Sequence, residues 1–180
     1  PIQAEGGDNH YRPEFFKALK EITMNDDMLL IVDEVQSGMG ITGKFWAVEH
    51  YGVEPDIISF GKKAQICGIM AGNRLNEVEN HVFAESSRIN STWGGNLVDM
   101  VLSSQILKVI RDENLVKNAA ETGTHLLEGI KAIETDKISN VRGKGLMIAF
   151  DLRDTETRGK MFNKLMDKGL FSIICGEKSI

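Results

Sequence analysis

Two short motifs in this sequence place charged side chains directly after apolar segments. The motif LLIVDE ends in Asp33 and Glu34, and the motif FGKK ends in Lys62 and Lys63. A carboxylate after a strand can pair with the protonated ring nitrogen of a cofactor. A lysine beside a flexible glycine is suited to act as a nucleophilic amine, because Schiff-base chemistry needs the neutral form of the amine. Taken singly, each motif is also typical of solvated surface charges.

The residues after the first motif extend the cofactor interpretation. Asp33 and Val35 are two positions apart, so on an extended backbone they project to the same face. A flat heteroaromatic ring could rest on Val35 while Asp33 reaches its nitrogen. Gln36 follows and offers both a donor and acceptors to a ring hydroxyl.

The alternative interpretation of the acidic motif is the magnesium-handling strand of an ATPase. Residues 38–44 formally match the phosphate-loop pattern G-x-x-x-x-G-K. Phe45, however, stands where a Ser or Thr should bind magnesium, and the loop has no strand of its own before it. These departures disfavour the ATPase.

A third motif, STWGGN, precedes a long helical pattern. Its hydroxyls on Ser91 and Thr92 and its glycine amides predict a phosphate site near a helix N-terminus. The alternative is a simple N-cap followed by a glycine turn.

These motifs require a sheet to position them. Apolar runs over residues 28–32, 56–60 and 67–71 predict three strands, the first buried on both faces. A helix is predicted to begin at Pro13, and residues 44–51 also look helical. Strands alternating with helices at this spacing predict a wound α/β sheet, whose ligands bind at the carboxyl ends of the strands.

After Asn96 the pattern changes. Helical spacing predicts two long helices, and then comes the order strand, strand, helix, strand of a small α+β domain. We place the boundary near residue 135, which gives domains 1–135 and 136–180. The predicted elements of this half are a helical pattern from residue 98 to 110, a helix from 115 to 133, strands at 138–142 and 146–152, a helix at 161–166 and a strand at 170–175.

Composition excludes several classes of protein. The net charge is −5 without a basic stripe, so no nucleic-acid partner is expected. No apolar stretch is long enough to cross a bilayer, so no membrane partner is expected either. The two cysteines, Cys67 and Cys175, lack metal-binding spacing, which disfavours zinc and disulfides and fits the cytoplasm. The start at Pro1 and the end at Ile180 predict a piece of a longer protein.

The motifs occur in an order that resembles a known family. PIQAEGG, LIVDEVQSG, FGKK and STWGG follow one another, and VRGKGL comes later. This succession resembles the class III (ω-amino acid) aminotransferases of pyridoxal 5′-phosphate (PLP) fold type I, over essentially the whole chain. The resemblance implies part of a large domain with a wound, mostly parallel sheet, followed by the start of a small α+β domain.

The resemblance also implies roles for matching residues. Asp33 would hold the pyridine nitrogen protonated, Val35 would pack behind the ring, and Gln36 would approach its 3′-oxygen. The family's spacing selects Lys62 over Lys63 as the lysine that binds PLP. Thr92 would bind the cofactor phosphate, usually that of the neighbouring subunit, which implies a homodimer.

The implied substrates are small amino and keto acids. The resemblance favours transfer of the terminal amino group of L-lysine to 2-oxoglutarate, giving 2-aminoadipate 6-semialdehyde and glutamate. 4-Aminobutyrate or another ω-amino acid is the alternative donor. By the same resemblance Glu5 would be a switchable partner for the arginine that grips the keto acid, while Gln36 and Asn90 would line the substrate pocket. A catalytically inactive structural fragment is the alternative of a different class.

Overall fold

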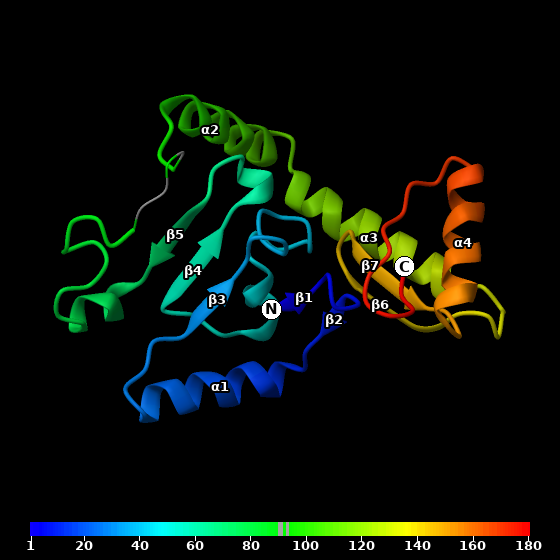
Figure 1. Cartoon of the computed structure of the whole chain (residues 1–180), viewed down its shortest axis with the longest axis horizontal. Helices are drawn as coiled ribbons and strands as arrows, with labels where there is room; N and C mark the ends of the chain where they lie inside the picture. The colour runs from blue at the N-terminus through cyan, green and yellow to red at the C-terminus, as the bar shows by residue number, and fades with distance from the viewer. Residues whose placement is uncertain (90–91, 93) are drawn as a thin grey trace.

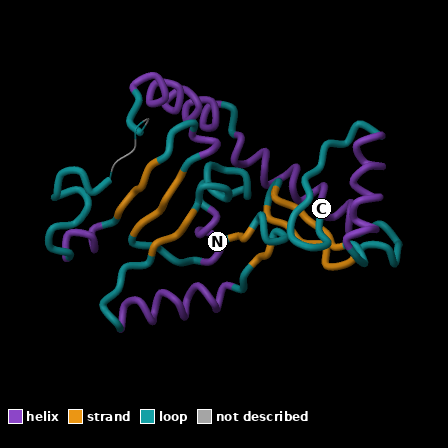
Figure 2. The backbone as a smooth tube through the Cα atoms, in the orientation of Figure 1, coloured by secondary structure: helices purple, strands orange, loops and turns teal. Residues whose placement is uncertain are grey.

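The computed structural model describes residues 1–89, 92 and 94–180, a mixed α/β chain whose described residues form one three-stranded sheet and two two-stranded sheets. A long helix leads from the three-stranded sheet to the two-stranded sheet near the C-terminus, and the N-terminus lies between these two sheets (Figures 1 and 2). The predictions made for residues 90 and 91 lie outside the described residues.

The larger sheet has the order β3-β4-β5 and carries the two charged motifs. The strands are β3 (Ile31–Asp33), β4 (Ile57–Phe60) and β5 (Gly68–Ala71). β3 and β4 are parallel and β4 and β5 antiparallel, so only one of the two pairings is parallel. All three predicted strands are confirmed, with bounds shifted by up to three residues.

The first strand is buried on one face only, so the predicted burial on both faces is wrong. Val32 belongs to a core cluster with Leu30 and Val48, whereas Ile31 is 62% exposed. Alternation along a strand sends these neighbours to opposite faces. No described element covers the face of Ile31, which explains the exposure of an apolar side chain that the sequence alone places in a core.

The covered face of the sheet packs against a short helical turn and one helix. The helix α1 (Pro13–Asn25) begins with its proline in the first turn, as predicted. Its Phe16 ring contacts Tyr51 of the 3₁₀ helix η1 (Ala47–Tyr51), with ring centroids 4.4 Å apart. Helix η1 is shorter than the predicted helix over 44–51, because Trp46 has an extended backbone, with φ −111° and ψ 134°, and the helix begins only after it.

Small elements connect the motifs to this sheet. The strands β1 (Ile2–Gln3) and β2 (Asn9–His10) form an antiparallel pair around a turn. The 3₁₀ helix η2 (Lys62–Ala64) follows β4 directly, and η3 (Asn73–Glu77) follows β5. The charged lysine motif therefore belongs to a tight turn at the carboxyl end of β4.

The second half begins with the two predicted long helices. Helix α2 (Leu97–Asp112) is capped by Asn96, whose side chain accepts from the amide of Val98 at 2.9 Å. Helix α3 (Leu115–Lys131) packs on β6 (Ser139–Lys144) and β7 (Met147–Asp151). This contact requires glycine, since a Cβ at Gly123 would lie 2.0 Å from the carbonyl oxygen of Gly145.

The end of the chain corrects one prediction. Helix α4 (Thr155–Asp167) is present, but residues 170–174 form no strand, and Phe171 and Ile173 are exposed. Residues 178–180 pair with β7 instead, with Phe150 and Ile180 exchanging backbone hydrogen bonds of 3.0 and 3.1 Å. The position beside β7 is thus already taken by a later segment. The domain boundary near residue 135 stays a prediction.

Within the described part of the chain, no helix combines the length and apolar character that a membrane crossing requires.

Candidate active site

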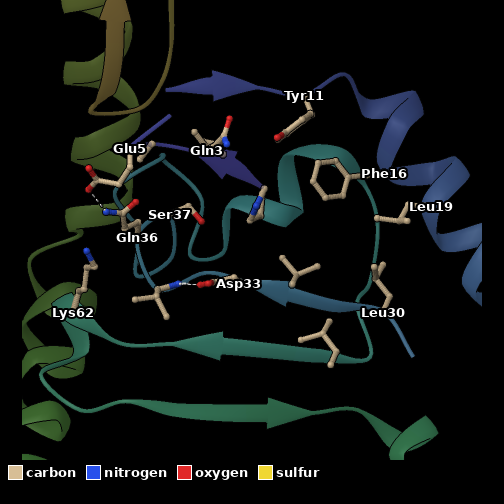
Figure 3. Close-up of a pocket in the computed structure, with 16 residues that line it drawn as sticks. Gln3, Glu5, Tyr11, Phe16, Leu19, Leu30, Asp33, Gln36, Ser37 and Lys62 are labelled. Carbon is tan, nitrogen blue, oxygen red and sulfur yellow. Dashed lines mark hydrogen bonds between the residues drawn. The ribbon is translucent and has the colours of Figure 1, made fainter. Parts of the chain in front are cut away.

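The carboxyl ends of β3 and β4 border a cavity of about 530 Å³. Five residues predicted from the sequence line this one cavity, from three separate segments of the chain (Figure 3). They are Glu5, Asp33, Val35, Gln36 and Lys62.

Asp33 and Glu34 are adjacent in the sequence but have different surroundings in the structure. Asp33 ends β3 and is exposed at the cavity, where its Oδ1 accepts from the amide of Val35 at 2.9 Å. Its Oδ2 has no hydrogen-bond partner among the described residues. Glu34 projects the other way and is fully buried, accepting from Ser37 Oγ at 2.5 Å and from the amide of Val48 at 2.7 Å.

Glu34 therefore holds the loop after β3 in place, a role that we did not predict. The signal for it was available, because alternation along a strand sends consecutive side chains to opposite faces. A buried carboxylate is tolerated here because both of its oxygens accept hydrogen bonds.

The two adjacent lysines also differ. Lys62 lines the cavity and is exposed, and its amine points towards Gln36 (Figure 3). Lys63 is half-buried and donates from Nζ to the backbone oxygen of Gln36 at 2.5 Å. Burial, and next the positive charge of Lys62, lower the pKa of the Lys63 amine, although the charge of Glu34 acts the other way.

The turn that carries Lys62 is tightly packed, although Lys62 itself is exposed. The tight packing lies one residue earlier, at buried Gly61. A Cβ there would lie 3.0 Å from Cys67 Sγ and 3.5 Å from a methyl group of Val35. The absence of a side chain at Gly61 lets the end of β4 approach Val35, which brings the lysine turn to the cavity.

Gln36 joins two walls of the cavity. Its Nε2 donates to Oε1 of Glu5 at 2.8 Å. Glu5 stands on a turn in which the amides of Gly7 and Asp8 donate to the oxygen of Ala4 at 3.1 and 2.8 Å. The amide side chain thus connects the loop after β3 to the N-terminal turn.

Sequence reasoning missed the residue that anchors this turn, Arg142 of β6. Its guanidinium donates to the backbone oxygens of Gly7 and, at 2.9 Å, of Asp8. The same group pairs with Asp151 at 2.8 Å and reaches Ser179 Oγ at 3.0 Å. Because these partners are far apart in the sequence, only the motif VRGKGL marks the residue, and nothing in that motif indicates its contacts.

Asp151 completes the anchor with a fully bonded carboxylate. Burial alone would raise its pKa, but hydrogen bonds from Ser179, Asn140 and Arg142, together with the charge of Arg142, hold the pKa below its ordinary value. The carboxylate therefore stays ionised and keeps Arg142 in place under the turn that presents Glu5.

The predicted phosphate site is not assembled in this cavity. Thr92 is exposed and does not line the cavity, and the predictions for Asn90 and Ser91 lie outside the described residues. Their roles in binding phosphate and substrate stay predictions.

The cavity combines a carboxylate, an apolar side chain, an amide and an amine. These are the groups that an enzyme needs to bind a ring cofactor through its nitrogen, its face, its hydroxyl and its aldehyde. Residues 1–180 match the family described as aminotransferase class-III. The chain belongs to this family of transferases, whose cofactor is PLP.

The similar curated proteins are aminotransferases that act on amino groups of two kinds of donor by name, L-lysine and 4-aminobutyrate. The chain is 44% identical to L-lysine-epsilon aminotransferase of Amycolatopsis lactamdurans and 46% identical to that of Mycobacterium tuberculosis, and each comparison covers 100% of the chain and 41% of the relative. Mitochondrial 4-aminobutyrate aminotransferase of Homo sapiens is 38% identical, with 100% and 36% covered. The chain thus spans about two-fifths of the length of these relatives.

Solved structures confirm the fold of the chain. A lysine aminotransferase from M. tuberculosis in the internal aldimine form superposes with a TM-score of 0.93 at 47% identity, covering 99% of this chain and 42% of that one. Plasmodium falciparum ornithine delta-aminotransferase gives a TM-score of 0.86 at 28% identity, covering 99% and 47%.

The cavity residues fit PLP. The exposed oxygen of Asp33 suits a protonated pyridine nitrogen, and the methyl groups of Val35 suit the face of a ring. The amide of Gln36 suits the ring hydroxyl, and the amine of Lys62 suits the aldehyde carbon.

Proposed function

We propose that the full-length protein containing this chain transfers the terminal amino group of L-lysine to 2-oxoglutarate, giving 2-aminoadipate 6-semialdehyde and glutamate. The carrying observation is that Asp33, Val35, Gln36 and Lys62 line one cavity at the carboxyl ends of β3 and β4. The choice of lysine is supported by the 44–46% identity to proteins named L-lysine-epsilon aminotransferase. The finer fold assignment, a portion of PLP fold type I, is part of the same proposal.

When bound, PLP supplies an electrophilic carbon and a ring that accepts electrons. Lys62 would hold the cofactor and then, as general base, would move a proton from the substrate carbon to the cofactor carbon. Its exposure at the cavity, with the amine directed at Gln36, leaves it free to exchange with an incoming amine. Lys63 does not line the cavity and is tied to the oxygen of Gln36, which supports the assignment to Lys62.

Asp33 would contribute a negative charge to the ring nitrogen of bound PLP. Its Oδ1 is oriented by the Val35 amide, so that the carboxylate is pre-organised and costs little reorganisation during the reaction. Val35 limits the ring from one face. Gln36 would orient the ring hydroxyl while its hydrogen bond to Glu5 keeps that carboxylate occupied.

The Gln36–Glu5 contact suits a site that takes two substrates in turn. A carboxylate held by a neutral amide rather than by a cation can change partners at low cost. We propose that Glu5 releases Gln36 or an arginine according to which substrate is bound, and that Asn90 lines the same pocket.

The assembly and location of the protein are further parts of the proposal. Thr92 is exposed and lies outside the cavity of its own chain, which supports its use by a neighbouring subunit in a homodimer. Both cysteines are unpaired, which supports the cytoplasm.

The test is a comparison of amine donors with 2-oxoglutarate and added PLP, after borohydride reduction has located the cofactor by peptide mapping. The expected result is a reduced adduct on Lys62 and faster turnover with L-lysine than with 4-aminobutyrate. Faster turnover with 4-aminobutyrate would replace the donor. An adduct without turnover of any ω-amino acid would instead favour the inactive structural protein.

A further inference from the structure

The contacts of Lys63 set it apart from the surface lysine that its position beside Lys62 suggests. Its amine is half-buried, and no carboxylate among the described residues lies within ion-pair distance of it. It donates instead to a single backbone oxygen, that of Gln36, at 2.5 Å. A charged donor on a neutral carbonyl makes a short and directional hydrogen bond.

The burial of this amine is unfavourable unless a contact within the protein compensates for the lost hydration. Desolvation and the charge of Lys62 both disfavour the charged form of the Lys63 amine, whereas the charge of Glu34 favours it. Lys62, Glu34 and the Gln36 carbonyl are therefore the surroundings that decide the state of Lys63. The hydrogen bond to Gln36 is the contact that offsets the loss of water.

Gln36 is consequently held at both ends. Its backbone oxygen accepts from Lys63, and its side-chain amide donates to Glu5 at 2.8 Å. The first contact ties it to the turn η2, which also carries Lys62. The second ties it to the N-terminal turn. The position of Gln36 relative to the amine of Lys62 thus depends on a side chain outside the cavity.

We propose that Lys63 is a positioning residue, which sets Gln36 against the cofactor by holding its backbone and thereby also preserves the Gln36–Glu5 contact. This inference rests on the proposed use of PLP by the cavity. It assigns distinct tasks to the two lysines of the motif FGKK, since Lys62 contacts the cofactor and Lys63 orients the cofactor's neighbour.

A double-mutant cycle in the full-length, PLP-loaded protein tests this coupling. The variants are Lys63→Met, Gln36→Ala and the two combined, and the measurement is the dissociation constant of PLP from visible absorbance. Lys63→Met is expected to raise this constant about tenfold, the effect of losing one charge-assisted hydrogen bond. In the Gln36→Ala background the same change is expected to raise it by less than about twofold, because the backbone oxygen that Lys63 holds remains but the side chain that it positions is gone.

Two further variants separate positioning from charge. Lys63→Arg, which keeps a charged donor, is expected to recover most of the affinity. Lys17→Met removes the same charge from an exposed position on α1 and is expected to leave the affinity unchanged within about twofold. If Lys63→Met does not fold, Lys63→Ala, which also lacks a donor, provides the same comparison.

Equal effects of Lys63→Met in both backgrounds, or no effect in either, would overturn the positioning role. Peptide mapping of the reduced wild-type adduct distinguishes this failure from that of the proposed function. An adduct on Lys62 with additive variants rejects only the role of Lys63. An adduct on Lys63, or none at all, rejects both.

Discussion

Both ends of the β3–β4 pair carry an aspartate and cationic side chains, but these groups differ in burial and in hydrogen-bond partners. At the carboxyl end, Asp33 and Lys62 are exposed around a cavity, and one oxygen of Asp33 has no partner among the described residues. At the amino end, Asp56 is buried and accepts from the amide of Leu30 at 2.7 Å. The same carboxylate pairs with Lys20 at 2.9 Å and with Arg74 at 3.0 Å.

The difference separates a structural charge from a functional one. Both carboxylate oxygens of Asp56 have partners, and its bonds join α1, η3 and Leu30, the residue just before β3, so its contribution is to stability. Asp33 keeps an oxygen free at the cavity, so it can bind a group that the chain itself does not provide. Both are aspartates beside short strands, and the comparison shows that partners, not residue type, distinguish them.

The largest expected effect is at the carboxyl end, on replacing Lys62. Lys62→Ala in the full-length protein is expected to lower the rate of amino transfer by roughly a thousandfold or more, because it removes both the attachment and the general base. Steady-state kinetics with L-lysine measure the loss. Lys63→Ala is the matched comparison, and an equal loss there would break the assignment.

The next effect is that of Asp33→Asn, which keeps the shape and removes the charge. The expected loss of turnover is about a hundredfold, typical of removing one pre-organised electrostatic group. Since Asp33 is exposed and makes no ion pair with the described residues, the free energy of unfolding of the protein is expected to change by less than about 0.5 kcal/mol. Urea unfolding checks this, and a large destabilisation would show that the carboxyl end is structural too.

Asp56→Asn is expected to show the reverse behaviour. Removing this charge leaves two cations facing a neutral amide, and the expected destabilisation is about 2 kcal/mol, less than for a fully enclosed pair because Lys20 and Arg74 are partly exposed. Urea unfolding measures the change, with exposed Asp136→Asn as control. Turnover of the folded variant is expected to persist, and its loss would erase the contrast between the two ends.

A smaller effect sharpens the comparison through pH. Burial alone would raise the pKa of Asp56, but the hydrogen bonds from Lys20 and Leu30 and the charges of Lys20 and Arg74 hold it below its ordinary value. The unfolded chain therefore binds more protons than the folded chain in the window below about pH 4, and stability falls as the pH falls through it. The free energy of unfolding, measured across this range, is expected to decline more steeply with falling pH for the wild type than for Asp56→Asn. Parallel curves would show that Asp56 does not contribute to the pH dependence of stability.

The sequence indicated which residues meet at the cavity better than it indicated the irregular parts of the fold. Asp33, Val35 and Gln36 are local to one strand end, so their joint presence at a cavity followed from alternation and from the rule on strand ends. The strand predicted at 170–175 failed because strand formation depends on a partner, and residues 178–180 occupy that place. Apolar spacing indicates which residues prefer burial but not which segment reaches a given edge first.

What the sequence by itself determined is the set of motifs, their order and therefore the family, along with the preference for Lys62 from its spacing. What only the tertiary structure decided is the division of labour inside each charged pair: Glu34 buried against Asp33 exposed, and Lys63 on the Gln36 carbonyl against Lys62 at the cavity. Neighbouring residues share composition and local propensity. Their roles diverge because burial and hydrogen-bond partners come from segments distant in the chain, which no local pattern encodes.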